Sequence, residues 1–387
     1  MKKILFIIFI ISFIQLKPQP PGLANCGNTC FLNASIQALY NINPLTNILT
    51  ANPNPYSSST RSLSYLYTEL IKEFEKENRP HIFSCDTVLG ELDKEAPEKI
   101  PGFKCGAQED ATEFFFYLLN DLLANTALQR SIRVLFKLYL KPIIECPAIE
   151  GFSASTKGLP PESDLSIKVE VIDDEIPLTS LMACLESFFK KEKFSDPQDP
   201  YRDTFTNKNR LDCTKQFKLL NSPEILQITL KRYQYISSTQ TQKLTHKIDI
   251  PLKINISEFL FTRPKDPENK HYELIGVIIQ GGTAKGGHYW AYVKTNEQWY
   301  KCNDSVITPV NISRENIPND ITGSATEGTG YLFIYQKTTI TRSEYELWQK
   351  LEKERKRKEA EQIAFKALSN ELEKLTGSLR SLTNLLK

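Results

Sequence analysis

Apolar residues recur at helical spacing in the first third of the chain. The first such stretch begins near residue 30, and Asn28 or Thr29 is placed to cap the helix that it predicts. Its apolar positions are Leu32, Ile36, Leu39 and Tyr40. A longer stretch follows an acidic run and predicts a strong amphipathic helix. Its apolar positions are Ala111, Phe114, Phe115, Leu118, Leu119, Leu122 and Leu123. Each helix is expected to bury one face.

The middle of the chain has shorter patterns. Further helices are predicted near 63–77 and 178–189. Alternating and β-branched residues predict strands at 132–140 and 165–171, and residues 195–206 indicate a loop or a β-turn. Two more strand segments follow, at 221–235, with one buried face, and at 243–260.

Residues 272–294 predict a strand, a loop and a second strand. Leu274, Val277 and Ile279 form the first arm, and the second arm begins at His288. The loop at 280–287 has four glycines in eight residues, so we expect it to be mobile and to allow close backbone approach.

The two ends of the chain differ from the middle. Two lysines precede an apolar run at 4–14, which is the layout of a signal peptide but is short for a membrane span of ~20 residues. A signal or anchor, an extension packed on the domain, and a misassigned start remain open for residues 1–20.

The segment 341–387 predicts a helix with a heptad stripe, weakened by Gly377. A coiled coil, a helix that docks on a partner, and a helix folded back on the domain are all compatible with it. The stripe consists of Phe365, Leu368, Leu372, Leu375, Leu379, Leu382 and Leu386.

Composition narrows the function classes. A chain of 387 residues with a net charge of +2 has no charge footprint for nucleic acid, and we expect no nucleic-acid partner. The eight cysteines are spread out, as is typical of reduced intracellular thiols. No C-x-x-C pair occurs, so we expect no structural zinc and no other metal or cofactor.

Cys30 falls in the first turn of the helix predicted near residue 30. Free backbone N–H groups and the helix dipole favour a thiolate there. The alternative is a small buried core residue, as most free cysteines are.

The sequence GLANCGNTCFLNASIQAL at 22–39 resembles the cysteine box of the ubiquitin-specific proteases, a deubiquitinase family with a papain-like core. The resemblance implies that Cys30 is the nucleophile and that Asn25 helps to bind the oxyanion. Gln108-Glu109-Asp110, followed by Glu113, resembles the family's second box. There we expect Gln108 or Asp110 to reach the cleft, with the acidic residues also favouring the helix start.

His288 matches the family's G-H-Y-x-A-Y-V box, and the resemblance makes it the base; a structural or merely exposed histidine is the alternative. The pattern W-Y-x-F-[DN]-D-x-x-V places Asn303 at the third triad position and Asp304 beside it, where either His288 or the oxyanion region is in reach. A simple turn is the alternative there. The chain departs from the family at Cys302, for phenylalanine, and at Gln280-Gly281, for the usual His-Ser-Gly.

The resemblance covers about residues 21–336 and implies one papain-like α+β catalytic domain with a helical lobe, a sheet lobe and a reduced fingers region at 130–220. Many family members carry two C-x-x-C pairs there, and this chain does not. The implied reaction is thiol-dependent hydrolysis of the (iso)peptide bond after the C-terminal glycine of ubiquitin.

Three alternatives remain: a silent ubiquitin-binding module, a protease for a ubiquitin-like modifier, and a membrane-tethered adaptor acting through 1–20 and 365–386. Expected partners are ubiquitin, ubiquitinated proteins and a coiled-coil partner at 365–386. Membrane contact through 4–14 stays open. A reducing location, cytoplasmic or nuclear, suits a thiol protease.

Overall fold

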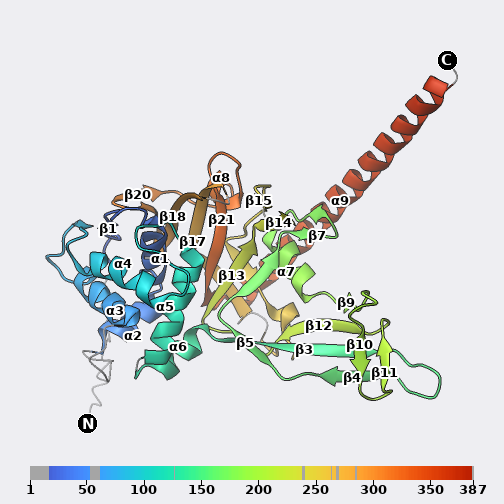
Figure 1. Cartoon of the computed structure of the whole chain (residues 1–387), viewed down its shortest axis with the longest axis horizontal. Helices are drawn as coiled ribbons and strands as arrows, with labels where there is room; N and C mark the ends of the chain where they lie inside the picture. Colours follow the sequence, from blue (N-terminus) through green and yellow to red (C-terminus); the bar gives the residue numbers. More distant parts are fainter. Residues whose placement is uncertain are drawn as a thin grey trace, which may run out of the picture.

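The computed structural model describes residues 17–52, 62–125, 127–237, 240–262, 264–266, 270–283 and 286–385. Helices gather on one side of a large β-sheet, a narrower sheet extends from the other side, and a long helix leaves the body at the C-terminal end (Figure 1). This mixture of helices and sheets confirms the predicted α+β class. The apolar run at 4–14 lies outside the described residues.

The helical lobe spans residues 30–136, and polar side chains mark where some of its helices begin. Ser62 accepts a hydrogen bond from the N–H of Tyr65 at 3.2 Å, which caps α3 in the segment predicted as helical. A short parallel pair joins β1 (Gly22–Leu23) to β2 (Ile82–Phe83) beside this lobe. Its helices are α1 (Cys30–Tyr40), α2 (Asn43–Thr50), α3 (Leu63–Phe74), α4 (Val88–Lys99), α5 (Ala111–Asn125) and α6 (Gln129–Phe136).

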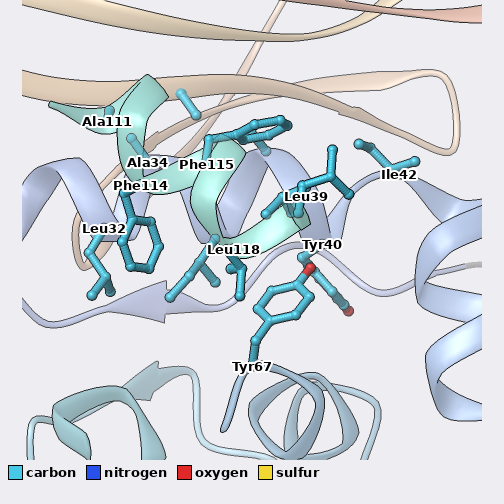
Figure 2. Close-up of a cluster of buried hydrophobic side chains, with 14 of the residues drawn as sticks. Leu32, Ala34, Leu39, Tyr40, Ile42, Tyr67, Ala111, Phe114, Phe115 and Leu118 are labelled. Atoms are coloured by element: carbon cyan, nitrogen blue, oxygen red, sulfur yellow. The ribbon is translucent and has the colours of Figure 1, made fainter. Parts of the chain in front are cut away.

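Helix α1 is buried on every side, which corrects the prediction of an amphipathic helix. All of its residues are buried, including the polar Asn33 and Gln37. The reason is its position: α1 packs against α5 on one side and against strand β18 on the other. Figure 2 shows Leu32 and Leu39 of α1 beside Phe114 and Leu118 of α5. The nucleophile candidate therefore begins a helix that neighbours on both lobes hold in place.

The large sheet follows the order β20-β19-β18-β17-β21-β13-β6, with β16 also pairing with β17. All of its pairings are antiparallel except β13 with β6. Its strands are β6 (Ile167–Glu170), β13 (Ile225–Lys231), β16 (Lys253–Asn255), β17 (His271–Thr283), β18 (Gly286–Thr295), β19 (Gln298–Asn303), β20 (Val306–Val310) and β21 (Thr329–Thr338).

Strand β13 differs from its prediction of one buried face, because residues 225–230 are all buried. Ile225 belongs to the core of the helical lobe, whereas Leu226 and Ile228 belong to a second core on the other face of the sheet. The intervening Gln227 and Thr229 are buried too. A central strand covered on both faces loses the alternation that predicts a half-buried strand.

The segment predicted as a strand at 132–140 is a helix followed by a strand. Ile132, Leu135 and Phe136 of α6 are buried, and they lie three and four positions apart. The strand begins only at Leu138 and alternates buried and half-buried residues to Cys146. Apolar spacing in a short run fits both structures, and contact with α2 and α5 selects the helix.

A narrower sheet is built from strands of the segment 138–219 (Figure 1). Cys146 and Cys213 form a disulfide at its far end, next to the hairpin of β10 with β11. Residues 195–206, predicted as a loop or turn, thus include one strand of that hairpin. The sheet consists of β3 (Leu138–Cys146), β4 (Ser155–Gly158), β5 (Glu162–Asp164), β9 (Glu192–Lys193) and β12 (Thr214–Leu219).

Shorter elements complete the fold, and the predicted helix near 178–189 is confirmed as α7 (Leu181–Phe189). The others are β7 (Ile172–Asp173), β8 (Ile176–Pro177), β10 (Tyr201–Asp203), β11 (Lys208–Arg210), β14 (Tyr233–Ser237), β15 (Gln240–Lys243), η1 (Ser257–Phe259) and α8 (Asn319–Thr322).

The C-terminal helix α9 (Arg342–Leu385) is docked at its start and projects from the body at its end (Figure 1). Tyr345 and Trp348 make edge-to-face contacts with the buried His271 ring, and Lys356 pairs with Glu186 and Glu258. The helix is therefore folded back over its first turns only. Over the described parts of the chain, none of the helices has the length and apolar character to cross a membrane.

Candidate active site

Cys30 is the first residue of α1 and is almost completely buried, with 2% of its surface exposed. Thr29 occupies the N-cap position, as one of the two predicted caps, but its side chain makes no capping bond. The Oδ1 atom of Asn25 instead accepts the N–H groups of Gly27 and Thr29, both at 3.1 Å. Gly27 and Asn28 take positive φ angles of 99° and 60°, so the loop folds back tightly. Asn25 thereby shapes the loop that presents Cys30.

The same loop carries a disulfide, which corrects the expectation of reduced thiols. Cys26 bonds to Cys85, 59 positions away, in the segment that leads into α4. Together with Cys146–Cys213, half of the cysteines are paired. The spacing along the sequence gave no signal for this, because the fold alone brings residues 26 and 85 together.

His288 and Asn303 lie side by side on neighbouring strands of the large sheet. The Nε2 atom of His288 is 2.5 Å from Oδ1 of Asn303, and His288 also hydrogen-bonds with Cys30. Since an amide oxygen only accepts, Nε2 carries the proton, which leaves Nδ1 as the ring nitrogen available to the thiol. The structure thus brings together Cys30, His288 and Asn303 from α1, β18 and β19.

The electrostatics of this cluster favour a thiolate–imidazolium pair. Burial by itself raises the pKa of Cys30, but hydrogen bonds from His288, the Tyr289 backbone and Gln108 outweigh it, and the pKa is lowered overall. The hydrogen bond with Cys30 raises the pKa of His288 to about 9; burial opposes this increase, and the hydrogen bond with Asn303 adds a smaller increase. A lowered thiol pKa beside a raised imidazole pKa is typical of an activated cysteine.

Asp304 lies next to Cys30, His288 and Asn303 and holds two nearby side-chain amides by hydrogen bonds. Its Oδ2 accepts the Nδ2 group of Asn25 at 3.0 Å, and its Oδ1 accepts Nδ2 of Asn33 at 2.8 Å. The distance from Oδ2 to Nε2 of His288 is 4.0 Å, too long for a hydrogen bond. Asp304 therefore orients the Asn25 amide directly and acts on His288 only through charge. Sequence reasoning missed Asn33, although it stands three residues after Cys30 and so faces the same side of α1.

Gln108 reaches the cleft, and Asp110 does not contact the thiol. The Nε2 atom of Gln108 is 3.5 Å from the Cys30 sulfur and also donates to the carbonyl of Gly287. Asp110 caps α5 instead: its Oδ1 accepts the N–H groups of Thr112 and Glu113 at 2.8 and 3.0 Å. Both functions suggested for this acidic stretch are thus present, on different residues.

The glycine-rich segment before His288 is mostly a paired hairpin, which corrects the prediction of an eight-residue loop. The ladder continues through Gly281–His288, Gly282–Gly287 and Thr283–Gly286, and residues 284 and 285 lie outside the described residues. Lys243 braces this turn by donating to the carbonyls of Gln280 and Gly282 at 2.6 and 3.2 Å. No sequence signal singled out Lys243.

A polar groove of about 460 Å³ adjoins the cluster, lined on one side by the start of α5 and on the other by the hairpin of β14 with β15 and the glycine turn. Gln108, whose side chain lies 3.5 Å from the Cys30 sulfur, is part of its lining. Its lining residues include Glu109, Asp110, Glu113, Tyr233, Gly286 and Gly287.

Two further observations concern thiols and metals. Cys302 lies 1% exposed in β19, and burial alone raises its pKa, so this thiol is inert. A search of the described residues found no group of three or more His, Cys, Asp or Glu side chains arranged to hold a metal ion.

Comparison with known families gives an independent line of evidence. Residues 21–335 match the family described as ubiquitin carboxyl-terminal hydrolase. The chain is 25% identical over 334 residues to ubiquitin carboxyl-terminal hydrolase 8 of Saccharomyces cerevisiae, and the aligned region covers 76% of this chain and 68% of that protein. It is 28% identical over 319 residues to ubiquitin carboxyl-terminal hydrolase 25 of Arabidopsis thaliana, covering 75% of this chain and 44% of that protein. The chain thus spans from under half to about two thirds of these relatives' lengths.

The fold has counterparts among solved structures. One is the SAGA DUB module of Ubp8, Sgf11, Sus1 and Sgf73 bound to ubiquitin aldehyde, with a TM-score of 0.67 and 23% identity. The similarity covers 85% of this chain and 71% of that one. A second structure of the Ubp8 module, bound to monoubiquitin, also has a TM-score of 0.67 and 23% identity, and it covers 83% of this chain and 70% of that one. This likeness confirms the papain-like α+β fold.

Proposed function

The chain belongs to the ubiquitin carboxyl-terminal hydrolase family of thiol-dependent deubiquitinating peptidases, and we propose that it hydrolyses the (iso)peptide bond after the C-terminal glycine of ubiquitin with Cys30 as nucleophile. One observation carries the assignment of residues. Cys30 and His288 are hydrogen-bonded at the start of a buried helix, and Asn303 holds the far side of the imidazole at 2.5 Å.

The proposed reaction starts from the thiolate–imidazolium pair. The Cys30 sulfur attacks the carbonyl carbon of the scissile amide, and the proton on Nδ1 of His288 passes to the leaving amine. The Oδ1 atom of Asn303 accepts a hydrogen bond from the Nε2–H group and so keeps the ring in one tautomer and orientation. Water then attacks the thioester, with His288 as the base, and releases the free C-terminal carboxylate.

The tetrahedral oxyanion is proposed to bind at the start of α1. Backbone N–H groups there have no partner within the helix and lie at the positive end of its dipole. The side-chain amide of Asn25 donates one proton to Asp304, which leaves its second N–H available for the oxyanion. Asp304 and Asn33 act as positioning residues, because they fix the Asn25 amide before substrate arrives.

Ubiquitin as the substrate is supported by the family and by the groove beside Cys30. Solved relatives of this fold include modules bound to monoubiquitin and to ubiquitin aldehyde. The groove is walled by glycines at 286 and 287, which admit an extended tail ending in two glycines. A silent binding module would not need the hydrogen-bonded Cys30–His288 pair.

A ubiquitin derivative with a thiol-reactive group at its C-terminus tests this proposal directly. We expect the wild-type chain to form a covalent adduct, and Cys30→Ala to form none while still binding ubiquitin. A matched Cys302→Ala variant should react like wild type. An adduct on Cys30→Ala would reject Cys30 as the nucleophile. A faster reaction with the same derivative of a ubiquitin-like modifier would show that this modifier, and not ubiquitin, is the preferred substrate.

The distal part of α9 is proposed to bind a coiled-coil partner. Phe365, Leu368 and Leu372 are 77, 65 and 63% exposed, beyond the point where Lys356 ties the helix to the body. Deleting residues 365–387 should leave cleavage of a small ubiquitin substrate unchanged and should remove any association measured by analytical ultracentrifugation or pull-down.

A cytoplasmic or nuclear location is proposed, because a free thiol nucleophile suits a reducing environment; the two disulfides argue for an oxidising compartment instead. Localisation of the full chain with and without residues 1–20 distinguishes this from membrane contact through 4–14.

A further inference from the structure

The side chain of Gln108 bridges the two lobes directly above the nucleophile. Its Nε2 donates to the carbonyl of Gly287, and its Oε1 accepts the N–H of Gly287 at 2.8 Å. One carboxamide thus satisfies both main-chain groups of one residue. Two residues facing each other in an antiparallel ladder exchange the same pair of hydrogen bonds.

Gly287 lies where the sheet edge is open. On one side β18 pairs with β17 at Gly282, but on the other side β19 joins only from Ala291 onward. The outward N–H and C=O of Gly287 therefore face the cleft, and Gln108 occupies them. A Cβ at position 287 would approach the Gly281 carbonyl to 1.9 Å, so only glycine fits here. An extended peptide lying along this edge would pair with the same two groups.

Gln108 also stands in front of the thiol. Its Nε2 atom is 3.5 Å from the Cys30 sulfur, and the groove beside the site is lined by Gln108, Gly286 and Gly287. A substrate whose carbonyl carbon meets Cys30 must lead its preceding peptide group through this point. The Gln108 carboxamide and that peptide group each offer one N–H donor and one C=O acceptor, and they compete for the N–H and C=O groups of Gly287.

We propose that Gln108 is a displaceable latch: in the free enzyme its carboxamide occupies the position that a main-chain peptide group of the substrate takes next to the scissile bond. The proposal rests on the proposed function for the identity of the substrate. Opening the latch breaks two hydrogen bonds, which the entering tail then re-forms with Gly287. Because only the opened state binds, the apparent affinity for substrate is reduced by the fraction of molecules that are open.

Removing the latch should therefore tighten substrate binding. Gln108→Met keeps the side-chain length and removes both hydrogen bonds to Gly287. In a Cys30→Ala background, where no turnover occurs, we expect Gln108→Met to bind ubiquitin about tenfold more tightly than Cys30→Ala alone, measured by calorimetry. Gln198→Met, in an exposed turn, is the matched control and should leave the dissociation constant unchanged. Equal or weaker binding by the Gln108→Met variant would overturn the latch.

A second readout does not depend on ubiquitin. With Cys30 present and at a pH where its thiol is fully ionised, iodoacetamide should alkylate Cys30 several-fold faster in Gln108→Met than in wild type, as located by peptide mass spectrometry. An unchanged or slower alkylation rate would reject the latch. If none of the variants bound ubiquitin, that separate result would reject ubiquitin as the substrate. Should Gln108→Met fail to fold by circular dichroism, Gln108→Ala, which removes both hydrogen bonds to Gly287 without adding a charge beside the thiol, replaces it with the same expected directions.

Discussion

Two buried thiols lie in the same domain, one at the start of α1 and one in the middle of β19, and their pKa values move in opposite directions. Cys30 and Cys302 are 2 and 1% exposed. Burial raises the pKa of both, but only around Cys30 do hydrogen bonds from His288, Tyr289 and Gln108 reverse the effect. The difference teaches that burial alone silences a cysteine. A helix start and a facing imidazole make it reactive.

The largest change should come from removing the imidazole, which would make the surroundings of Cys30 resemble those of Cys302. His288→Ala removes the base and the principal partner of the thiolate, so we expect kcat/KM on a fluorogenic ubiquitin amide to fall ~10²- to 10⁴-fold. Alkylation of Cys30 should shift to higher pH, because only the hydrogen bonds from the Tyr289 backbone and Gln108 then oppose the effect of burial on the thiol pKa. An unchanged alkylation midpoint would contradict the pairing.

In the wild type, activity should rise with pH as Cys30 ionises below its ordinary pKa. It should decline above about 9, as His288 loses the proton that the leaving amine needs.

The loop before Cys30 has a covalent tether that β19 lacks, and cutting it should have the next largest effect. Cys26→Ser combined with Cys85→Ser removes a cross-link between residues 59 positions apart. The free energy of unfolding, measured by urea titration without reductant, should fall by up to about 4 kcal/mol. A reductant opens both disulfides, so wild type and variant should then have the same free energy of unfolding. The pair Cys146→Ser and Cys213→Ser is the matched control far from the site, and it should lower stability while leaving kcat unchanged.

Next in size is the oxyanion contact. Asn25→Ala should reduce kcat by the equivalent of ~3 kcal/mol, about 10²-fold, with a smaller change in KM. Asp304→Asn weakens only the orientation of that amide, so we expect a loss of about tenfold. Steady-state kinetics at one pH separates the two. If Asp304→Asn reduced activity more than Asn25→Ala, Asp304 would act on His288 rather than through Asn25.

The smallest effect is expected at Cys302 itself. Cys302→Ala removes one buried atom, so stability should fall by about 1 kcal/mol and activity should stay within about twofold of wild type. Thermal unfolding and the fluorogenic assay measure the two quantities. A loss of activity comparable to that of His288→Ala would show that the sequence position beside Asn303, and not the electrostatic surroundings, decides which thiol matters.

The chemistry of the site could be predicted from the sequence because its residues stand in dense local motifs. Cys30, His288, Asn303 and Asn25 were each named from stretches of fewer than twenty residues, and the structure brings them together. Helices whose apolar spacing runs over three turns, such as α5, were predicted for the same reason. Local spacing fails where the same residues fit two structures, as in α6, or where every side is covered, as in α1.

By itself, then, the sequence determined the types of most elements, the family resemblance and the residues proposed to carry the chemistry, because periodicity and motifs are local properties. Only the tertiary structure decided the contacts between distant segments. Cys26 meets Cys85, Asp304 meets Asn33, and Gln108 meets Gly287 across 59, 271 and 179 positions. These contacts depend on how lobes and strands are arranged in space. They decide which buried thiol is ionised, how the oxyanion amide is held and what covers the nucleophile.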